Sequence, residues 1–565
     1  MEMLVFLIVL FAVFLYVMIR GSIEEKKSKQ AYRERLRTLY GHFSDKTYTP
    51  EQLDRIARFY MHRQQENDID AITWNDLSMD TVFERINFTQ SSSGEEYLYA
   101  MLRQPILCDK EGRQDYMEKH IHYMMEHEKE RLDTMMLLHE LGNTGKYALF
   151  DYLDYLDKLG VRSNLPHYGC ILLLVVSIAL IFVKASLGVP LVIAVACMNI
   201  VTYMKEKGIA APYVTTFSYI MRMIKCADSI LKMGYSAELG EYTTSLQENR
   251  KKFKDFDKNS RMVLMMNVSA GSMDELLFDY IKMLTHIDII RFNQMLYMVQ
   301  KNRPAIMRLT DNIGYLDAVI SIGYFRAALP YYCTPVLTDE KLLQFSLQDG
   351  FHPCIDNPIA NSFDQNRGMI VTGSNASGKS TFLKTAAINA ILAQTIHTCT
   401  ARAYCGNYFR IYSSMALRDN LDQGESYYIV EIKALKRIID AADAKQSNPL
   451  LCFVDEVLRG TNTVERIAAS AQILESLSYK NTICFAATHD IELTHLLEKE
   501  YDNFHFEEEV RDGDVLFSYR LLEGRAHTRN AIKLLEIIGL SKNIVERAER
   551  MAGRFLENRE WTFIN

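Results

Sequence analysis

The sequence lacks three features that would point to common functional classes. Its ten cysteines include no CxxC spacing, which argues against a zinc site, and several lie in apolar runs typical of buried, reduced thiols. With 64 Lys and Arg against 71 Asp and Glu, the net charge of −7 does not indicate a nucleic-acid partner, although a local basic surface stays open. The chain also contains no internal repeat of solenoid period and no long low-complexity segment.

The composition that is present describes a globular chain with some membrane content. Hydrophobic residues make up 48% and charged residues 24% of the sequence, so the chain is not a disordered one. Its 565 residues exceed what one hydrophobic core normally supports, and we expect two or three domains.

The first apolar segment, Met3 to Ile19, predicts a membrane anchor. Its 17 uncharged residues are just long enough to cross a hydrocarbon layer of about 30 Å. A cleaved signal peptide is the weaker alternative, because Glu2 precedes the run and no small-residue cleavage site follows it. The basic residues that follow are Arg20, Lys26, Lys27, Lys29, Arg33, Arg35 and Arg37. By the positive-inside rule, the rest of the chain is then cytoplasmic.

A second apolar block, residues 168–204, carries one charge, Lys184, in its middle. It is too long for one span, and the turn residues "KASLGVP" predict two short spans folded as a hairpin. Basic residues flank both ends, which places both ends in the cytoplasm. A buried helical pair in a soluble domain is the alternative. Apart from Asn199, these spans contain no further polar group that could line a transport path.

On either side of the hairpin the pattern is helical. Residues 78–160 and 208–330 carry apolar side chains at spacings of three and four with abundant Glu and Lys, which predicts long helices. A charged stretch at 248–261 interrupts the pattern, either as a solvated turn or, less expected, as a phosphate contact. From about residue 350 the pattern changes to alternating strand and helix signals.

The motif "GSNASGKS", Gly373 to Ser380, lies between a β-branched strand and a helix and so predicts a phosphate-binding loop. Glycines let backbone N–H groups surround phosphates at a helix amino terminus. Lys379 would reach the β- and γ-phosphates, and the Ser380 hydroxyl would bind Mg²⁺.

Two later strands complete the expected site. After the apolar run 450–454, Asp455 is expected in the magnesium shell and Glu456 beside the attacking water. A third strand, "NTICFAATHD", ends near His489, which we expect to sense the γ-phosphate. The catalytic residues predicted here are therefore Lys379, Glu456 and His489.

Five blocks resemble the MutS proteins of DNA mismatch repair, members of the ABC-type ATPase superfamily. They are "TGSNASGKST", "ESYYIVEI", "FVDEVLRGTNT", "ATHDIELTHL" and the tail "FSYRLLEGRAHTRNAIKLLEIIGLSKNIVERA", in the family's order. Upstream, "INFTQSSSGEEYLYAMLRQPI" resembles the start of the family's helical core. The segment "LDAVISIG" resembles the part in which the chain returns to that core before the ATPase domain. The resemblance implies ATP and Mg²⁺ as cofactors. It implies nucleotide contacts from Gly373, Ser374, Asn375, Ala376, Ser377, Gly378, Lys379, Ser380, Thr381 and, from the partner of a homodimer, Ser426.

The expected fold is α plus α/β, with a long-helix core followed by a P-loop ABC-type ATPase domain and three transmembrane helices. The expected parts are an anchor at 1–20, a cytoplasmic helical linker at 21–77, a MutS-like core or lever at 78–345 interrupted by the hairpin 168–204, and the ATPase domain at 346–565.

The sequence departs from mismatch-binding members of the family. Only about 80 residues precede the expected core, which leaves no room for the domain whose Phe-x-Glu wedge enters the duplex. Such strings occur only at Phe506–Glu508 and Phe555–Glu557, and we treat them as chance.

We therefore expect a multi-pass protein of the cell membrane, with core and ATPase domains in the cytoplasm. It would hydrolyse ATP as a composite-site dimer and associate with DNA non-specifically, through phosphates, without reading mismatches. The alternative is an ATP-driven motor or signalling component of a membrane complex with no DNA contact. The expected partners are ATP, the lipid bilayer, a second copy of the chain and, less firmly, DNA.

Overall fold

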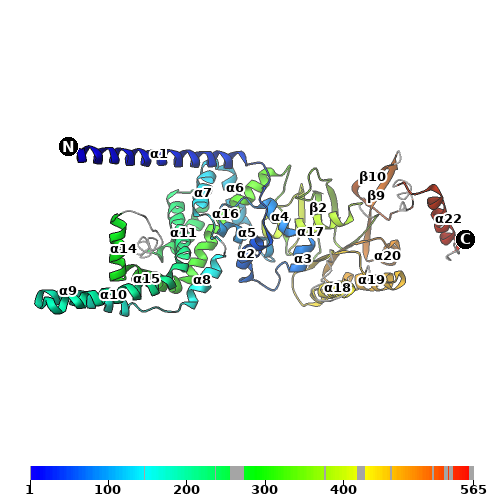
Figure 1. Ribbon diagram of the computed structural model, residues 1–565. Coiled ribbons are helices and arrows are strands. Elements are labelled where there is room, and N and C mark those ends of the chain that lie inside the picture. Colours follow the sequence, from blue (N-terminus) through cyan, green and yellow to red (C-terminus); the bar gives the residue numbers. More distant parts are fainter. Residues whose placement is uncertain are drawn as a thin grey trace. The chain divides into compact units, whose positions relative to one another are not determined.

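The computed structural model describes residues 2–145, 147–235, 237–254, 273–374, 377–415, 427–458, 461–511, 514–526, 532 and 539–558. The described chain is helix-rich and mixed α+β (Figure 1). It divides into two compact units. The first contains Met1–Arg63, Asn87–Ala100 and Glu118–Phe325, and the second contains Gln64–Ile86, Met101–Met117 and Arg326–Asn565.

The first unit is built from helices. They are α1 (Glu2–Thr38), α2 (Pro50–Met61), α5 (Ser92–Arg103), α6 (Arg113–Glu126), α7 (Glu128–Leu141), α8 (Leu149–Lys158), α9 (Leu165–Val183), α10 (Ala185–Ala210), α11 (Val214–Lys232), α12 (Gly240–Lys251), α14 (Met273–Thr285), α15 (Ile287–Lys301) and α16 (Arg303–Ala328), with short 3₁₀ turns at Ala211–Tyr213 and Ala237–Leu239. The unit boundary falls within α5, α6 and α16. The long helices expected from the apolar spacing are therefore present.

Local sequence explains how these helices start and pack. Helix α2 begins with a capping box, in which the Gln52 N–H donates to Thr49 Oγ1 and the Thr49 N–H to Gln52 Oε1, and Pro50 occupies its first turn. Farther along the unit, Phe217 of α11 and Phe292 of α15 are fully buried, with ring centroids 5.3 Å apart. The core thus lies between helices that are distant in sequence.

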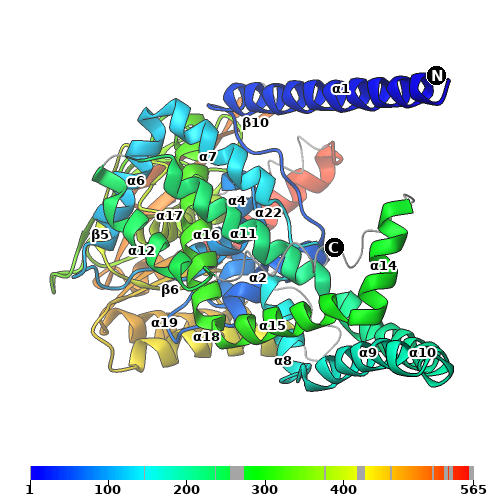
Figure 2. The same cartoon turned by 90° about the vertical axis from the view of Figure 1, so that its left-hand side faces the viewer.

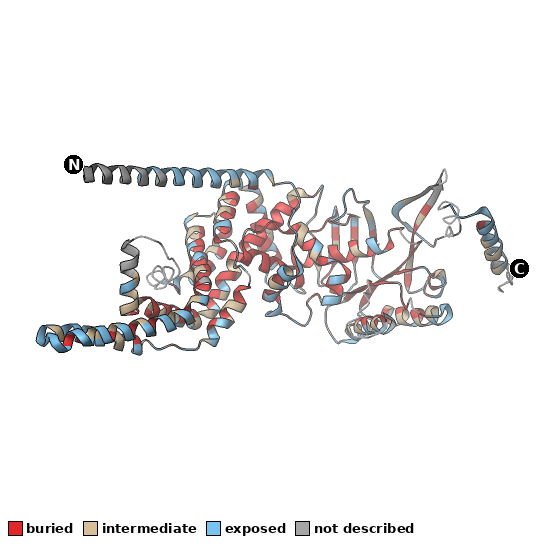
Figure 3. Ribbon diagram, in the orientation of Figure 1, coloured by how far each residue is buried: buried red, intermediate tan, exposed pale blue. Residues whose placement is uncertain are grey.

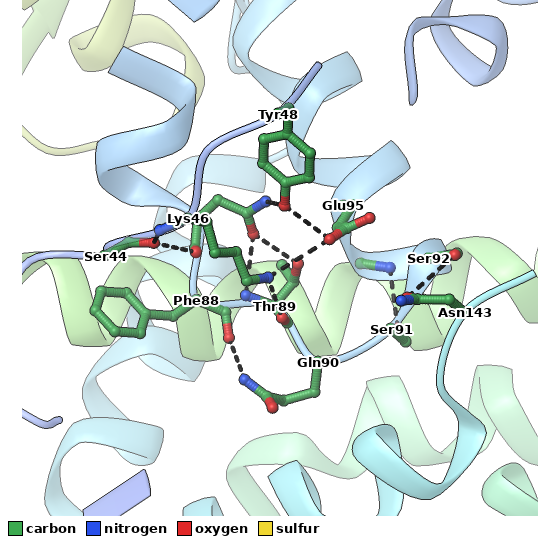
Figure 4. A network of polar contacts seen from close by, with 12 residues as sticks. Ser44, Lys46, Tyr48, Phe88, Thr89, Gln90, Ser91, Ser92, Glu95 and Asn143 are labelled. Atoms are coloured by element: carbon green, nitrogen blue, oxygen red, sulfur yellow. Dashed lines mark hydrogen bonds and ion pairs between the residues drawn. The ribbon is translucent and has the colours of Figure 1, made fainter. Parts of the chain in front are cut away.

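A polar network joins the strand-like segment before α2 to the start of α5 (Figure 4). The Tyr48 hydroxyl donates to Glu95 Oε1 at 2.7 Å, and Lys46 Nζ donates to the Thr89 carbonyl at 2.6 Å. Ser44 Oγ donates to the Asn87 carbonyl at 2.8 Å. The motif that resembles the start of the family's helical core is therefore held by side chains from an earlier segment.

Helices α9 and α10 run side by side as a hairpin (Figures 1 and 2). Chain direction reverses at Lys184 alone, so the expected turn "KASLGVP" is wrong in extent: Ala185 to Pro190 continue as helix α10. Gly188 permits the close approach, because a Cβ there would lie 2.5 Å from the Ile181 nitrogen. Most residues of the hairpin are exposed or half-buried (Figure 3). Large apolar side chains are among the exposed ones, and Phe182 is 88% exposed.

Among the residues that the structure describes, two helices are long and apolar enough to cross a membrane, Leu165–Val183 and Ala185–Tyr213. They coincide with the predicted hairpin. The third predicted span, 3–19, belongs to α1, which continues unbroken to Thr38. The side chains of residues 2–14, 17 and 18 lie outside the described part of the chain.

The second unit contains two sheets. The six-stranded sheet has the order β10-β9-β4-β8-β7-β6, and only its β9–β10 pair is antiparallel. Its strands are β4 (Gly368–Thr372), β6 (Arg410–Ser414), β7 (Leu450–Asp455), β8 (Thr482–Thr488), β9 (Tyr501–Arg511) and β10 (Asp514–Glu523). The four-stranded sheet has the order β1-β5-β2-β3, with β1 (Val336–Thr338), β2 (Phe345–Gly350), β3 (Asn361–Gln365) and β5 (Ala403–Asn407).

The helices of this unit are α3 (Ala71–Asp76), α4 (Met79–Ile86), α17 (Lys379–Thr395), α18 (Tyr427–Asp443), α19 (Thr463–Ser478), α20 (Ile491–Leu496) and α22 (Lys542–Asn558). Strands β7 and β8 are buried at every residue, as expected for parallel strands covered on both faces. One face packs Cys452 and Val454 against Leu435 of α18 and Leu474 of α19. On strand β8, Phe485 lies 5.2 Å from the Phe363 ring of the smaller sheet, measured between centroids.

The early segment Gln64–Ile86 belongs to this unit, although it spans the end of the expected linker and the start of the expected helical core. Asp76 of α3 accepts hydrogen bonds from Ser413 Oγ at 2.8 Å and from the Met415 N–H at 2.9 Å. Strand β6 is the edge of the six-stranded sheet, so α3 covers backbone groups that would otherwise be unpaired.

Candidate functional site

The candidate site begins where strand β4 passes into helix α17. Gly378 precedes the helix with φ of +105°, and Gly373 follows the strand with φ of +148°. A Cβ at residue 373 would lie 2.9 Å from the Phe506 carbonyl oxygen and from Ser377 Oγ. Both positions therefore require glycine, for conformation and for space. The predicted contacts Asn375 and Ala376 lie outside the described residues.

Lys379 is the first residue of α17 and is buried. Its Nζ donates to the carbonyls of Gly373 and Ser374, both at 2.8 Å, and lies 3.5 Å from His489 Nε2. The ammonium is therefore held at the mouth of the loop by two backbone acceptors. The Ser374 hydroxyl donates to Glu508 of β9, a carboxylate that the sequence analysis did not identify.

The two residues expected to bind magnesium touch each other. The Ser380 hydroxyl donates to Asp455 Oδ2 at 2.5 Å. Asp455 is the last residue of β7, and Ser380 is the second of α17, so the carboxyl end of a parallel strand meets the helix amino terminus. A hydroxyl and a carboxylate are hard oxygen donors of the kind that Mg²⁺ prefers, so the residues present fit that ion.

Glu456 and His489 lie together at the ends of β7 and β8. Glu456 Oε1 is 2.8 Å from His489 Nε2, and the Glu456 N–H donates to the Ala487 carbonyl at 2.9 Å. Glu456 adopts φ of +56°, a conformation that is uncommon for a residue with a side chain. The backbone turn directs its carboxylate away from the sheet and toward His489.

Both side chains line a cavity of about 140 Å³, whose remaining walls are Val457, Arg466, Thr488 and Asp490. It has room for a small number of water molecules and contains polar partners for them. Arg466 makes two hydrogen bonds to Asp490, at 2.6 and 2.9 Å, and this contact is the main cause that raises the pKa of Arg466. Sequence reasoning missed Arg466, although it follows the quoted "TNT" by only three residues.

A second cavity, of about 370 Å³, lies beside Gly378 of the loop and Thr381 of α17. Its other walls are Leu347, Gly350, His352, Ile355, Asp356, Asn357, Pro358, Ile359, Asn361, Phe382, Thr385, Phe506 and Tyr519. Burial, with a smaller contribution from Lys384, lowers the pKa of His352 to about 4. Its ring is therefore neutral at pH 7, and its Nδ1 accepts from the Cys354 N–H at 3.2 Å. Four aromatic rings, those of His352, Phe382, Phe506 and Tyr519, are among its walls, and we call it the aromatic cavity.

The fold thus brings together Lys379, Ser380, Asp455, Glu456 and His489, which come from three separate parts of the sequence. Gly373, Ser374, Ser377 and Gly378 occupy the loop around them, and Thr381 lies in the first turn of α17. Ser426, expected to act on a partner's nucleotide, lies outside the described residues. The aromatic cavity was not foreseen, because its walls come from β2, β3, α17, β9 and β10 and no local motif marks them.

Comparison with known proteins agrees with this arrangement. Residues 369–556 match the family model described as MutS domain V. The chain is 24% identical over 384 residues to the DNA mismatch repair protein MutS of Thermotoga maritima, covering 58% of this chain and 47% of that protein. It is 28% identical over 287 residues to the DNA mismatch repair protein MSH3 of Candida albicans, covering 46% and 27%. It is 27% identical over 280 residues to MutS of Chlamydia trachomatis, covering 47% and 33%.

The carboxyl-terminal region therefore has the sheet, loop and strand-end carboxylates of a MutS domain V. Residues 369–556 are therefore similar to MutS domain V, and the chain is similar to MutS proteins over about half of its length. It spans about half or less of the length of these curated relatives.

Proposed function

We propose that this protein binds ATP with Mg²⁺ and hydrolyses the γ-phosphate. The observation that carries the proposal is the convergence of the Ser380–Asp455 pair and the Glu456–His489 pair on one glycine loop. Backbone N–H groups at the start of α17 would receive the phosphates. Lys379 Nζ would exchange its two carbonyl acceptors for phosphate oxygens, which supplies the positive charge that phosphoryl transfer requires.

Magnesium would be held by Ser380 and Asp455, and when bound it would neutralise charge on the phosphates. Glu456 would orient the attacking water from the small cavity and accept its proton. His489 would hold the Glu456 carboxylate and face the γ-phosphate through its position near Lys379. The aromatic cavity beside Gly378 would take the adenine ring, with neutral His352 contributing no charge.

Two variants separate binding from hydrolysis. Lys379→Ala should abolish ATP binding, whereas Glu456→Gln should keep binding and lower turnover by about 10²- to 10⁴-fold, the usual contribution of a general base. Glu465→Gln is the control, since Glu465 is an exposed carboxylate on the neighbouring helix α19. Binding is measured by calorimetry and turnover by phosphate release. Unimpaired turnover in Glu456→Gln would show that another group activates the water.

We also propose that two copies close around ATP, with Ser426 of each copy facing the γ-phosphate of the other, as the family resemblance implies. The Glu456→Gln variant tests this as well, since it should accumulate the ATP-bound state. Sedimentation with saturating ATP should then give a dimer, and without nucleotide a larger fraction of monomer. A variant that binds ATP and stays monomeric would contradict the shared site.

We propose further that the hairpin α9–α10 inserts in the cell membrane and that the two units lie in the cytoplasm. The supporting observation is the outward-facing apolar surface of the hairpin, since such an extended patch is rare on a surface that faces water. With α1 as a third span, the protein would be a multi-pass membrane ATPase.

DNA is the proposed partner of the assembly, because the relatives are named as DNA mismatch repair proteins. We propose non-specific contact without mismatch reading. In support, Phe506 of one Phe-x-Glu string is buried in β9, where it cannot enter a duplex. Binding of matched and mismatched duplexes should then be equal and fall steeply with salt. A tenfold mismatch preference would contradict the proposal, and no binding at low salt would favour a membrane motor without DNA contact.

A further inference from the structure

Among the described residues, three hydrogen bonds from three different elements hold the backbone of the turn that carries Glu456. The Glu456 N–H donates to the Ala487 carbonyl of β8 at 2.9 Å, and Ser470 Oγ of α19 donates to the Val457 carbonyl at 3.3 Å. The third contact is the shortest: the Leu458 N–H donates to Glu431 Oε1 of α18 at 2.5 Å. Only this third contact uses an acidic side chain.

This contact is fully enclosed. Glu431 is 1% exposed and Leu458 is 5% exposed. Leu458 has φ of +60°, and with Glu456 at +56° the turn contains two left-handed residues that are not glycine. Such a backbone persists only where surrounding contacts hold it. A carboxylate that accepts a backbone N–H makes a stronger hydrogen bond than a neutral acceptor does, and burial removes competing water.

Helix α18 is itself attached to the sheet independently of this turn. Arg437 Nη2 donates to the Ser413 carbonyl of β6, and Leu435 and Ile438 pack in the same apolar cluster as Leu458. Glu431 lies about one helical turn from the start of α18 at Tyr427. A displacement of this end of α18 would therefore pull on the Leu458 N–H and rotate the Glu456 carboxylate relative to His489.

We propose that Glu431 is a positioning residue, which fixes the Glu456 turn through Leu458 and makes hydrolysis depend on the position of α18. The role rests on the proposed ATP hydrolysis at this site. Glu431 does not contact the nucleotide in this account. It acts only on the geometry of the residue that orients the water.

Three substitutions of Glu431 distinguish the effect of its side-chain length from the effect of its charge. Glu431→Gln keeps the length and one acceptor oxygen, so kcat should stay within about threefold of the parent. Glu431→Asp keeps the charge but retracts the carboxylate by one methylene, and Glu431→Ala removes it. Both should lower kcat at least tenfold, equivalent to about 1.4 kcal/mol. All three should bind ATP with nearly unchanged Kd, because the phosphate loop is untouched.

Asp440→Ala is the matched control, since Asp440 lies on the same helix, is exposed and pairs with Lys436 of that helix. It should leave kcat and Kd unchanged. Unfolding midpoints identify any variant that loses activity by misfolding. An active Glu431→Asp with an inactive Glu431→Gln would overturn the proposal, as would full activity in all three variants.

Hydrogen exchange of the Leu458 amide provides a readout that does not depend on activity. In the unsubstituted protein this amide should exchange at least tenfold more slowly than exposed amides, and Glu431→Ala should remove that protection. Fast exchange in the unsubstituted protein would overturn the proposal. If Glu456→Gln turned over ATP normally, the proposed hydrolysis would fail, while the exchange result would still decide whether Glu431 holds the turn.

Discussion

Two adjacent acidic residues in α5 of the helical unit have opposite environments. Glu95 accepts from the Tyr48 hydroxyl and pairs with Arg55 at 3.2 Å. Glu96 is 1% exposed, and its Oε1 has no hydrogen-bond partner in the described part of the chain. Burial raises the pKa of Glu96 to about 8, although the Arg55 charge partly opposes the shift. At pH 7 the folded protein therefore keeps Glu96 protonated.

This difference predicts a pH dependence of stability. Between pH 4.5 and 8 the unfolded chain ionises Glu96 and the folded chain does not, so its contribution to the free energy of unfolding falls as pH rises. The slope approaches about 1.4 kcal/mol per pH unit. Glu96→Gln should remove it, so the variant should gain stability relative to the parent from pH 5 to pH 8.

Denaturant unfolding at the two pH values measures this gain. The control is Glu95→Gln, which breaks an ion pair and should lower stability at both pH values. An equal stability difference at pH 5 and pH 8 for Glu96→Gln would show that the carboxyl is not protonated in the fold.

At the scale of elements, helices α5 and α16 approach closely because each has a glycine at the contact. A Cβ on Gly94 would lie 2.2 Å from Asp317 Oδ2, and one on Gly314 would lie 2.5 Å from the Ser93 carbonyl oxygen. Asp317 in turn accepts from the Ser91 N–H at 2.9 Å and from Ser91 Oγ at 2.7 Å. Ser91 Oγ accepts from the Gly94 N–H at 3.1 Å and so caps α5. The buried Asp317 side chain holds this capping residue, which ties the start of one helix to the middle of the other.

Gly314→Ala should push these helices apart. The added methyl group meets backbone and the Tyr97 Cβ, neither of which can rotate away, so we expect a loss of about 1–3 kcal/mol. Thermal unfolding followed by circular dichroism measures it. Gly208→Ala in α10 is the control, because no atom lies within 4 Å of the added carbon and alanine favours a helix. A Gly314→Ala protein as stable as the parent would mean that the helices do not cross this closely.

At the scale of the whole molecule, the start of α9 and the end of α10 lie close together, at the end of the hairpin opposite its tip. Arg162, before α9, pairs with Glu206 near the end of α10 at 3.0 Å. Near these ends the Tyr203 hydroxyl donates to Asp288 of α15 at 2.7 Å, and burial raises the pKa of Asp288. Polar groups therefore gather where the hairpin joins the helical unit, and Lys184 marks its far tip.

A topology experiment tests whether that tip crosses a membrane. A reporter inserted at Ser186, beside the tip, should read external, whereas reporters fused after Gly21 or at the carboxyl terminus should read cytoplasmic. The reason is that basic residues at both ends of the hairpin favour the cytoplasmic side. A cytoplasmic reading at Ser186 would show that the hairpin does not cross the membrane.

The sequence by itself determined the features that depend on short spacings. The glycine loop, the two carboxylates at the end of β7 and the apolar lengths of α9 and α10 are each contained in fewer than about 30 consecutive residues, and local geometry is sufficient to recognise them. Helical periodicity likewise predicted the helices of the first unit. It did not locate the reversal at Lys184, because "ASLGVP" resembles a turn but packs as helix against Ile181.

Only the tertiary structure decided which distant residues complete the site. Glu431 meets Leu458, Glu508 meets Ser374, and His352 and Tyr519 line one cavity, although no pair is close in sequence. The hydrogen bonds from Ser413 Oγ and the Met415 N–H to Asp76 likewise join residues that are distant in sequence. These contacts depend on the order of the strands and on how helices cover both faces of the sheet. Neither feature can be read from the residue spacing within a single segment.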